Sequence, residues 1–251
     1  MSNDVSLQQR ERLDDLQNHG MKILQKVNGY RFSMDSVLLA HFARLSKNMR
    51  IADLGTGSGI IPLLMSQRET TARFFAFENQ PEMADMARRS VLINGLEKQI
   101  RVYCDDLRNA PHLLGTGNMD GVVCNPPYGR SDGTDTSIRD ARRLACMETD
   151  CNLRELAATC SALLKNHGRL SICFPVSRMP ELTDVLRACR LEPKRARMVC
   201  ARTEKPPYLL LLEAVKNAKP SLLWLPTLFV CQEDGTQTEE IERIYSAQES
   251  G

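Results

Sequence analysis

A short apolar strand followed at once by a glycine-rich loop constrains the fold of this chain most. Residues 50–54 read Arg-Ile-Ala-Asp-Leu, residues 55–59 read Gly-Thr-Gly-Ser-Gly, and an apolar helical segment starts at Ile60. Glycines let a backbone approach a ligand closely, and a helix N-terminus offers unpaired N–H groups. The spacing differs from the dinucleotide fingerprint, and no Lys-Ser/Thr follows as in a P-loop. Alone, such a loop also occurs in plain turns.

Three more strand-like segments end in polar residues. Residues 73–77 lead to Glu78, residues 100–104 lead to Asp105 and Asp106, and residues 119–124 lead to Asn125, with helical segments between the strands. This alternation predicts an open parallel sheet that binds its ligand beyond the carboxyl edge. A carboxylate at position 78 is placed to accept hydrogen bonds from ribose hydroxyls, although a solvated glutamate at a strand end is the alternative.

The tetrapeptide Asn125-Pro126-Pro127-Tyr128 suggests the chemistry. The two prolines end the strand, lack N–H donors and keep the chain stiff. An Asn oxygen and a bare carbonyl can accept the two hydrogens of an NH2 group, while the tyrosine stacks on a planar ring. The alternative is a strand-ending turn with a half-buried tyrosine, because Asn-Pro often starts turns.

Composition and cysteine spacing predict the cellular location and the domain organisation of the chain. The chain has 251 residues, a net charge of +2, and nine cysteines without C-x-x-C spacing. With no signal peptide or long apolar span, these features predict reduced thiols, a cytoplasmic location and no membrane contact. The four scattered histidines give no support for a metal site. We expect one main domain at 49–251 with an N-terminal extension at 1–48, and a monomer or weak dimer.

The remaining segments complete this prediction. Residues 1–20 are expected to form a weak helix or a frayed terminus, and residues 21–27 and 30–32 a hairpin around Asn28-Gly29. A helix follows the N-cap Ser33. Further along, we expect helices at 153–164 and 180–189, a strand at 169–174, antiparallel closing strands at 208–215 and 222–231, and a partly helical tail at 233–251.

Two basic segments are candidates for contact with a phosphate backbone. One is a polar loop that carries Arg139, Arg142 and Arg143, and the other runs from Arg187 to Lys205. Clustered cations of this kind attract phosphates, whereas the alternative is a solvated charged surface.

In this order, the 53–59 loop, Glu78, Asp106 and the tetrapeptide resemble the class I S-adenosylmethionine-dependent methyltransferases that methylate an amino nitrogen. Residues 30–40 and 233–241 are similar to the bacterial tRNA1(Val) (adenine-37-N6)-methyltransferase family. The resemblance covers most of the chain. One departure is residues 145–148, Ala-Cys-Met-Glu, where the family leads us to expect Ala-Arg-His-Glu.

The resemblance implies a Rossmann-like, seven-stranded, mostly parallel α/β sheet with an antiparallel closing strand. It also implies S-adenosyl-L-methionine as cofactor and tRNA as substrate, with methylation at N6 of adenine 37. Catalytic roles would fall on Asn125, Pro126, Pro127 and Tyr128. Cofactor contacts would come from Ser33, Asp35, Asp53, Gly55, Thr56, Gly57, Gly59, Glu78, Asn79, Asp105, Asp106 and Asn125, with either Asp105 or Asp106 at the adenine.

Two other functions share these motifs. A protein glutamine N5-methyltransferase of release factors would use the same tetrapeptide, because a carboxamide offers the same NH2 geometry. Fewer than 50 residues precede the first sheet strand, which is too short for the helical domain of those enzymes. The other alternative is a non-catalytic RNA-binding protein with a methyltransferase fold, which the intact cofactor and tetrapeptide motifs argue against.

Overall fold

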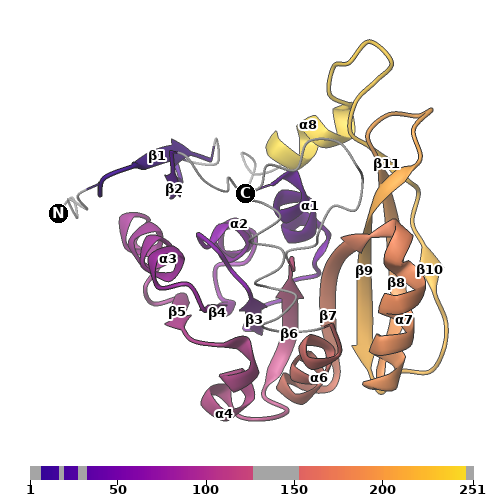
Figure 1. Ribbon diagram of the computed structural model, residues 1–251, viewed down its shortest axis with the longest axis horizontal. Coiled ribbons are helices and arrows are strands. Elements are labelled where there is room, and N and C mark those ends of the chain that lie inside the picture. Colours follow the sequence, from indigo (N-terminus) through magenta and orange to yellow (C-terminus); the bar gives the residue numbers. More distant parts are fainter. Residues whose placement is uncertain (1–6, 17–19, 28–32, 127–152, 247–251) are drawn as a thin grey trace.

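The computed structural model describes residues 7–16, 20–27, 33–126 and 153–246 (Figure 1). Its central sheet has the strand order β10-β8-β9-β7-β6-β3-β4-β5, and β11 also pairs with β8. The strands are β3 (Arg50–Leu54), β4 (Arg73–Glu78), β5 (Ile100–Cys104), β6 (Met119–Cys124), β7 (Leu164–Pro175), β8 (Leu191–Cys200), β9 (Pro207–Lys216), β10 (Leu223–Trp224) and β11 (Leu228–Phe229).

The strand directions confirm the predicted fold class. Strands β5, β4, β3, β6 and β7 run parallel, and β9 runs antiparallel between β7 and β8. These seven strands form the predicted mostly parallel sheet with its antiparallel closing strand. The prediction for 222–231 was wrong in direction, because β10 and β11 are two-residue strands that pair parallel with β8.

Helices cover both faces of the sheet. Figure 1 shows α1 (Met34–Phe42), α2 (Ile60–Arg68) and α8 (Glu239–Ser246) above the sheet, and α4 (Ala110–Leu114) and α6 (Leu153–Leu163) below it. The remaining helices are α3 (Pro81–Ile93), α7 (Met179–Ala188) and the 3-10 turns η1 (Leu107–Asn109) and η2 (Val176–Arg178). None of the helices in the described ranges has the length and apolar character needed to cross a membrane.

Alternating side chains of the inner strands build two apolar layers. In β9, Leu209 and Leu211 pack in the cluster that contains residues of α1, α2 and α8. Leu210 and Leu212 point the opposite way, into the cluster with α6 and α7. A strand buried on both faces needs apolar residues at nearly every position, which explains the continuous apolar run of β9.

The N-terminal hairpin differs from the predicted one. Strand β2 (Lys22–Lys26) pairs antiparallel with β1 (Glu11–Asp15), within the segment expected to be a weak helix or frayed terminus. The predicted partner at 30–32 and the Asn28-Gly29 turn lie outside the described residues. The prediction missed β1 because its sequence, Glu-Arg-Leu-Asp-Asp, is charged and poor in β-forming residues.

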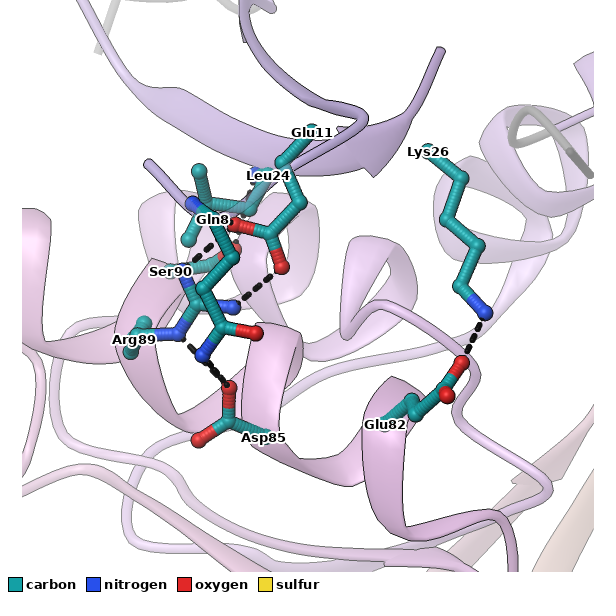
Figure 2. A network of polar contacts seen from close by, with 8 residues as sticks. All are labelled: Gln8, Glu11, Leu24, Lys26, Glu82, Asp85, Arg89 and Ser90. Atoms are coloured by element: carbon teal, nitrogen blue, oxygen red, sulfur yellow. Dashed lines mark hydrogen bonds and ion pairs between the residues drawn. The ribbon is translucent and has the colours of Figure 1, made fainter. Parts of the chain in front are cut away.

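Polar contacts hold this hairpin on α3 (Figure 2). The Arg89 guanidinium binds both Glu11 carboxylate oxygens and also donates to Asp85 at 2.8 Å. The Leu24 backbone N–H donates to the Ser90 hydroxyl at 2.9 Å. The hydrogen bonds from Arg89 are the largest cause of the lowered pKa of Glu11. The charged strand β1 is therefore fixed by ion pairs on a helix, in place of the apolar packing that fixes the inner strands.

Much of the basic segment 187–205 forms strand β8, which the sequence prediction did not include. Several of its cations are paired with carboxylates or a carbonyl of the fold, some of them at the surface. The pairs are Arg187 with Glu192 at 3.2 Å, Arg195 with Glu213 at 3.1 Å, Arg197 with Glu240 at 2.7 Å, and Lys194 with the Lys219 carbonyl at 3.0 Å.

Glu213 is the anion on which this part of the sheet depends. Its side chain is only 1% exposed, and it pairs with Arg169 at 2.9 Å as well as with Arg195. Replacing Glu213 by Gln leaves these arginines without their counter-charge. We expect the free energy of unfolding to fall by about 3 kcal/mol, near the lower limit for a broken buried ion pair because Arg169 is partly exposed.

Urea unfolding of the purified variant measures this change. The matched control is Glu181→Gln, which removes the exposed partner of Arg178 and should cost less than about 1 kcal/mol. Equal losses in the two variants would contradict the structural role assigned to Glu213.

Candidate cofactor and substrate site

The polar residues predicted from the sequence gather at the carboxyl edge of the parallel strands. Asp53 lies in β3, Glu78 ends β4, Asp105 follows β5, and Asn125 follows β6. Strand β3 lies between β4 and β6, and the chain order reverses between β3 and β6. Open α/β sheets bind ligands at such a reversal point, beyond the carboxyl ends of the strands.

The glycine loop is bound to the end of β4 by its own backbone. The N–H groups of Gly55 and Thr56 both donate to the Phe77 carbonyl at 2.9 Å. Gly55, Gly57 and Gly59 have φ angles of +80°, +58° and +89°, a region that disfavours other residues. The loop therefore keeps a fixed backbone conformation at the start of α2.

Glu78 is held in place at the end of β4. Its Oε2 accepts from the Gly57 N–H and its Oε1 accepts from the Gln80 N–H, each at 2.9 Å. Glu78 as a whole is only 5% exposed, whereas Asn79 beside it is exposed. These two backbone donors fix the orientation of the carboxylate at the end of β4.

Asp53 is a buried carboxyl group without a hydrogen-bond partner. Its side chain has no exposed surface, and neither oxygen is hydrogen-bonded. Burial, followed by the charge of Glu78, raises the pKa of Asp53 to about 7. The Thr56 side chain offsets this in part, although its hydroxyl is also without a hydrogen bond of good geometry. Because buried polar atoms are nearly always paired, this site is suited to a ligand that brings donors or a positive charge.

The two carboxylates after β5 have different local partners. Asp105 Oδ1 accepts from the Asp106 N–H at 2.7 Å and from the Asn109 side chain at 2.8 Å. Asp106 pairs with Arg108, which lowers the pKa of Asp106. Both carboxyl groups are half-buried at the same strand end, and both are already oriented by neighbours.

The Asn125 amide is bound at both of its ends. Its Nδ2 donates to the Ser36 hydroxyl at 2.8 Å, and the Cys173 thiol donates to its Oδ1 at 2.9 Å. Pro126 follows, half-buried, while Pro127 and Tyr128 lie outside the described residues. Sequence reasoning missed both partners. Ser36 lies in the 30–40 segment used for the resemblance, but Cys173 had no signal beyond its place in the strand next to β6.

Helix α1 brings the N-terminal extension to this edge. Ser33 is its N-cap and Asp35 lies in its first turn, both half-buried. Asp35 is close enough to Cys173 to add to the effect of burial, which raises the pKa of that thiol.

The arginine loop with Arg139, Arg142 and Arg143 lies outside the described residues, as does the 145–148 departure. Within the described residues, no group of three or more His, Cys, Asp and Glu is arranged to hold a metal ion.

Comparison with known proteins agrees with this geometry. The model of the methyltransferase small domain matches residues 33–174, which is more than half of the chain. The chain belongs to that family. The matched region of this methyltransferase begins at the N-cap of α1 and ends in β7, so it spans the glycine loop, Glu78, Asn125 and Cys173.

A named relative and solved structures support the same assignment. A tRNA1(Val) (adenine(37)-N6)-methyltransferase from Parabacteroides distasonis is 30% identical over 74% of this chain and 78% of the relative. A predicted O-methyltransferase from Agrobacterium tumefaciens superposes with a TM-score of 0.70 at 21% identity, covering 86% of this chain and 97% of that one. A SAM-dependent O-methyltransferase from Thermotoga maritima gives 0.53 at 17% identity, covering 76% and 68%. The resemblance drawn from the motifs is confirmed.

The raised pKa of Asp53 makes stability depend on pH. Between the ordinary value of 3.8 and about 7, the folded protein binds more protons at this group than the unfolded chain. The free energy of unfolding therefore falls as the pH rises through this window. The side chain in the variant Asp53→Asn does not titrate. Relative to this variant, we expect the free energy of unfolding of the wild type to fall by up to roughly 4 kcal/mol across this pH window.

Urea unfolding without ligand, repeated from about pH 4 to about pH 8, compares the two proteins across this window. The difference in stability between them should change with pH. Parallel curves would mean that Asp53 titrates normally in the folded protein.

Proposed function

We propose that this methyltransferase transfers a methyl group from S-adenosyl-L-methionine to the exocyclic N6 of an adenine in tRNA, and that the target is adenine 37 of tRNA1(Val). The oriented Asn125 amide at the carboxyl edge, next to the unpaired Asp53 carboxylate, is the observation that carries the proposal. The name of the Parabacteroides distasonis relative supports the RNA and the position.

The described residues fit the cofactor. The buried Asp53 carboxyl, which lacks a partner, suits the cofactor's ammonium group, and Glu78 suits the two ribose hydroxyls. Asp105 or Asp106 is placed for the adenine amine, and the glycine loop lets the backbone lie against the ligand. When bound, the cofactor supplies an electrophilic methyl group on a sulfonium. Ser33, Asp35, Thr56 and Asn79 line the same edge in this proposal.

Asn125 and Pro126 act on the substrate amine. The N6 lone pair of adenine is delocalised into the ring and is a poor nucleophile. Hydrogen bonds from the NH2 group to Asn125 Oδ1 and to the Pro126 carbonyl favour a tetrahedral nitrogen, so they strengthen as the transition state forms. No strong general base is required, because the N6 proton becomes acidic only after transfer. Pro127 keeps this segment rigid, and Tyr128 stacks on the base.

The two ends of the basic segment 187–205 lie at opposite edges of the sheet. Strand β8 runs in the same direction as β7, because both are antiparallel to β9. The turn after β8, with Arg202 and Lys205, therefore lies at the carboxyl edge with Asn125. Arg187 and Arg190 lie before β8, at the opposite edge. We assign Arg202 and Lys205, together with Arg139, Arg142 and Arg143, to phosphate contacts with tRNA.

The reaction is tested with purified protein, radiolabelled S-adenosyl-L-methionine and tRNA from a bacterial strain that lacks the modification. We expect label in N6-methyladenosine after nuclease digestion, and a much slower but measurable transfer in Asn125→Ala. Label in a protein fraction instead would favour glutamine methylation. Cofactor binding without any transfer, to either RNA or protein, would contradict the proposed reaction.

The assignment of the RNA-binding surface is tested by charge reversal. The double variant Arg202→Glu/Lys205→Glu should raise KM for tRNA and reduce the salt slope of log KM by about 1 for each lost phosphate contact. The control is Arg187→Glu/Arg190→Glu, which makes the same change of charge at the other edge. Similar increases in KM for both variants would show that only the net charge matters.

A further inference from the structure

The orientation of the Asn125 amide has to be fixed for the proposed function to work. The oxygen and nitrogen of an asparagine amide have nearly the same shape, but the oxygen accepts hydrogen bonds and the nitrogen donates them. An NH2 substrate needs the acceptor. A half-turn of the amide would place the Asn125 NH2 group, a donor, against the substrate NH2 group, also a donor. The substrate amine could then not bind. Only the hydrogen-bond partners of the amide distinguish these two orientations.

Ser36 is the partner of the nitrogen. Its hydroxyl accepts from Asn125 Nδ2 at 2.8 Å, and the residue is 3% exposed. Ser36 belongs to α1, so this bond joins the N-terminal part of the chain to the end of β6. Water has little access to replace the serine oxygen at this position.

Helix α1 is itself anchored at its opposite end. Arg68 donates to the carbonyls of Ala40 and Ala43, the latter at 3.2 Å. Arg195 donates to the Phe42 carbonyl at 2.7 Å, and its guanidinium lies 4.1 Å from the centre of the Phe42 ring. Two arginines thus bind the free carbonyls of the last turn, where a helix lacks internal partners. Ser36 is therefore carried on a fixed support.

Cys173 is the partner of the oxygen. Its thiol donates to Asn125 Oδ1 at 2.9 Å from strand β7, which neighbours β6, and the residue has no exposed surface. Burial, and to a smaller extent Asp35, raises the pKa of this thiol well above its ordinary value, so it stays protonated at neutral pH. A thiol is a weak donor, and the amide oxygen has a second lone pair for the substrate.

We propose that Ser36 and Cys173 are positioning residues that hold the Asn125 amide with its oxygen toward the substrate amine. They touch neither substrate nor cofactor in this role, and they act through Asn125 from two elements on either side of it. The inference rests on the proposed function, because only an amine substrate requires this orientation.

Kinetics of single variants test the proposal on tRNA. Ser36→Ala and Cys173→Ala should each lower kcat, by up to about 100-fold for a misplaced group, with KM for the cofactor unchanged. Ser36→Thr and Cys173→Ser keep a hydroxyl at each position and should recover most of kcat. The controls are Ser66→Ala, which removes another buried hydroxyl from α2, and Cys160→Ala, which removes a buried thiol from α6. Both controls should retain kcat.

Double variants show whether the two residues act through Asn125. In an Asn125→Ala background, removing Ser36 or Cys173 should cause no further loss, since residues that act as a unit are not additive. Additive losses, or no recovery in Ser36→Thr, would overturn the proposal.

A measurement without substrate separates this inference from the proposed function. In protein labelled with 15N-asparagine, the Asn125 side-chain signals are those missing from Asn125→Ala. We expect slow hydrogen exchange at Nδ2 in the wild type and in Ser66→Ala, and fast exchange in Ser36→Ala. Slow exchange in Ser36→Ala would overturn the positioning role. If the wild type methylated no tRNA, the proposed reaction would fail while this exchange experiment still decided the orientation.

Discussion

The buried carboxyl group of Asp53 is the constraint on which the site depends. It lies in the central strand of the parallel sheet, with no surface exposed and no hydrogen bond to either oxygen. Removing a charged group from water without a partner is costly, and the cost appears as a pKa of about 7. The surrounding apolar layers must supply the stability that this position loses. The position is therefore suited to a ligand that brings donors or a positive charge.

Among the described residues, several arginines are bound within the fold, whereas other cations lie in a turn at the carboxyl edge. Arg89, Arg195 and Arg68 are bound to carboxylates or helix carbonyls within the fold, where a planar guanidinium can serve several acceptors at once. Arg202 and Lys205 lie in a turn at the carboxyl edge. The net charge of +2 for the whole chain therefore says little about the local charge at this edge.

The sequence allowed the parallel core and the positions of Asp53, Glu78 and Asn125 to be predicted, because apolar strands ending in polar residues give a local signal. Strand β1 escaped prediction because ion pairs with α3 fix it, and β8 because its basic side chains are neutralised by distant residues. The bond from Ser36 to Asn125 joins residues 89 positions apart. No local pattern records such a contact, and the hydrogen bond of Cys173 is equally hidden among apolar neighbours.

The pairing of Asn125 with Ser36 and Cys173 has a consequence for the assembly of the chain during synthesis. Ser36 emerges first, the tetrapeptide follows, and Cys173 is added last, in a strand that pairs with β6 only after α6 has been made. A nascent chain that stops between residues 126 and 173 would carry the glycine loop, the carboxyl groups of Asp53 and Glu78, and Asn125. The Asn125 amide would then have only Ser36 as a hydrogen-bond partner. The sequence motifs of the site would therefore be complete before the orientation of this amide is fixed.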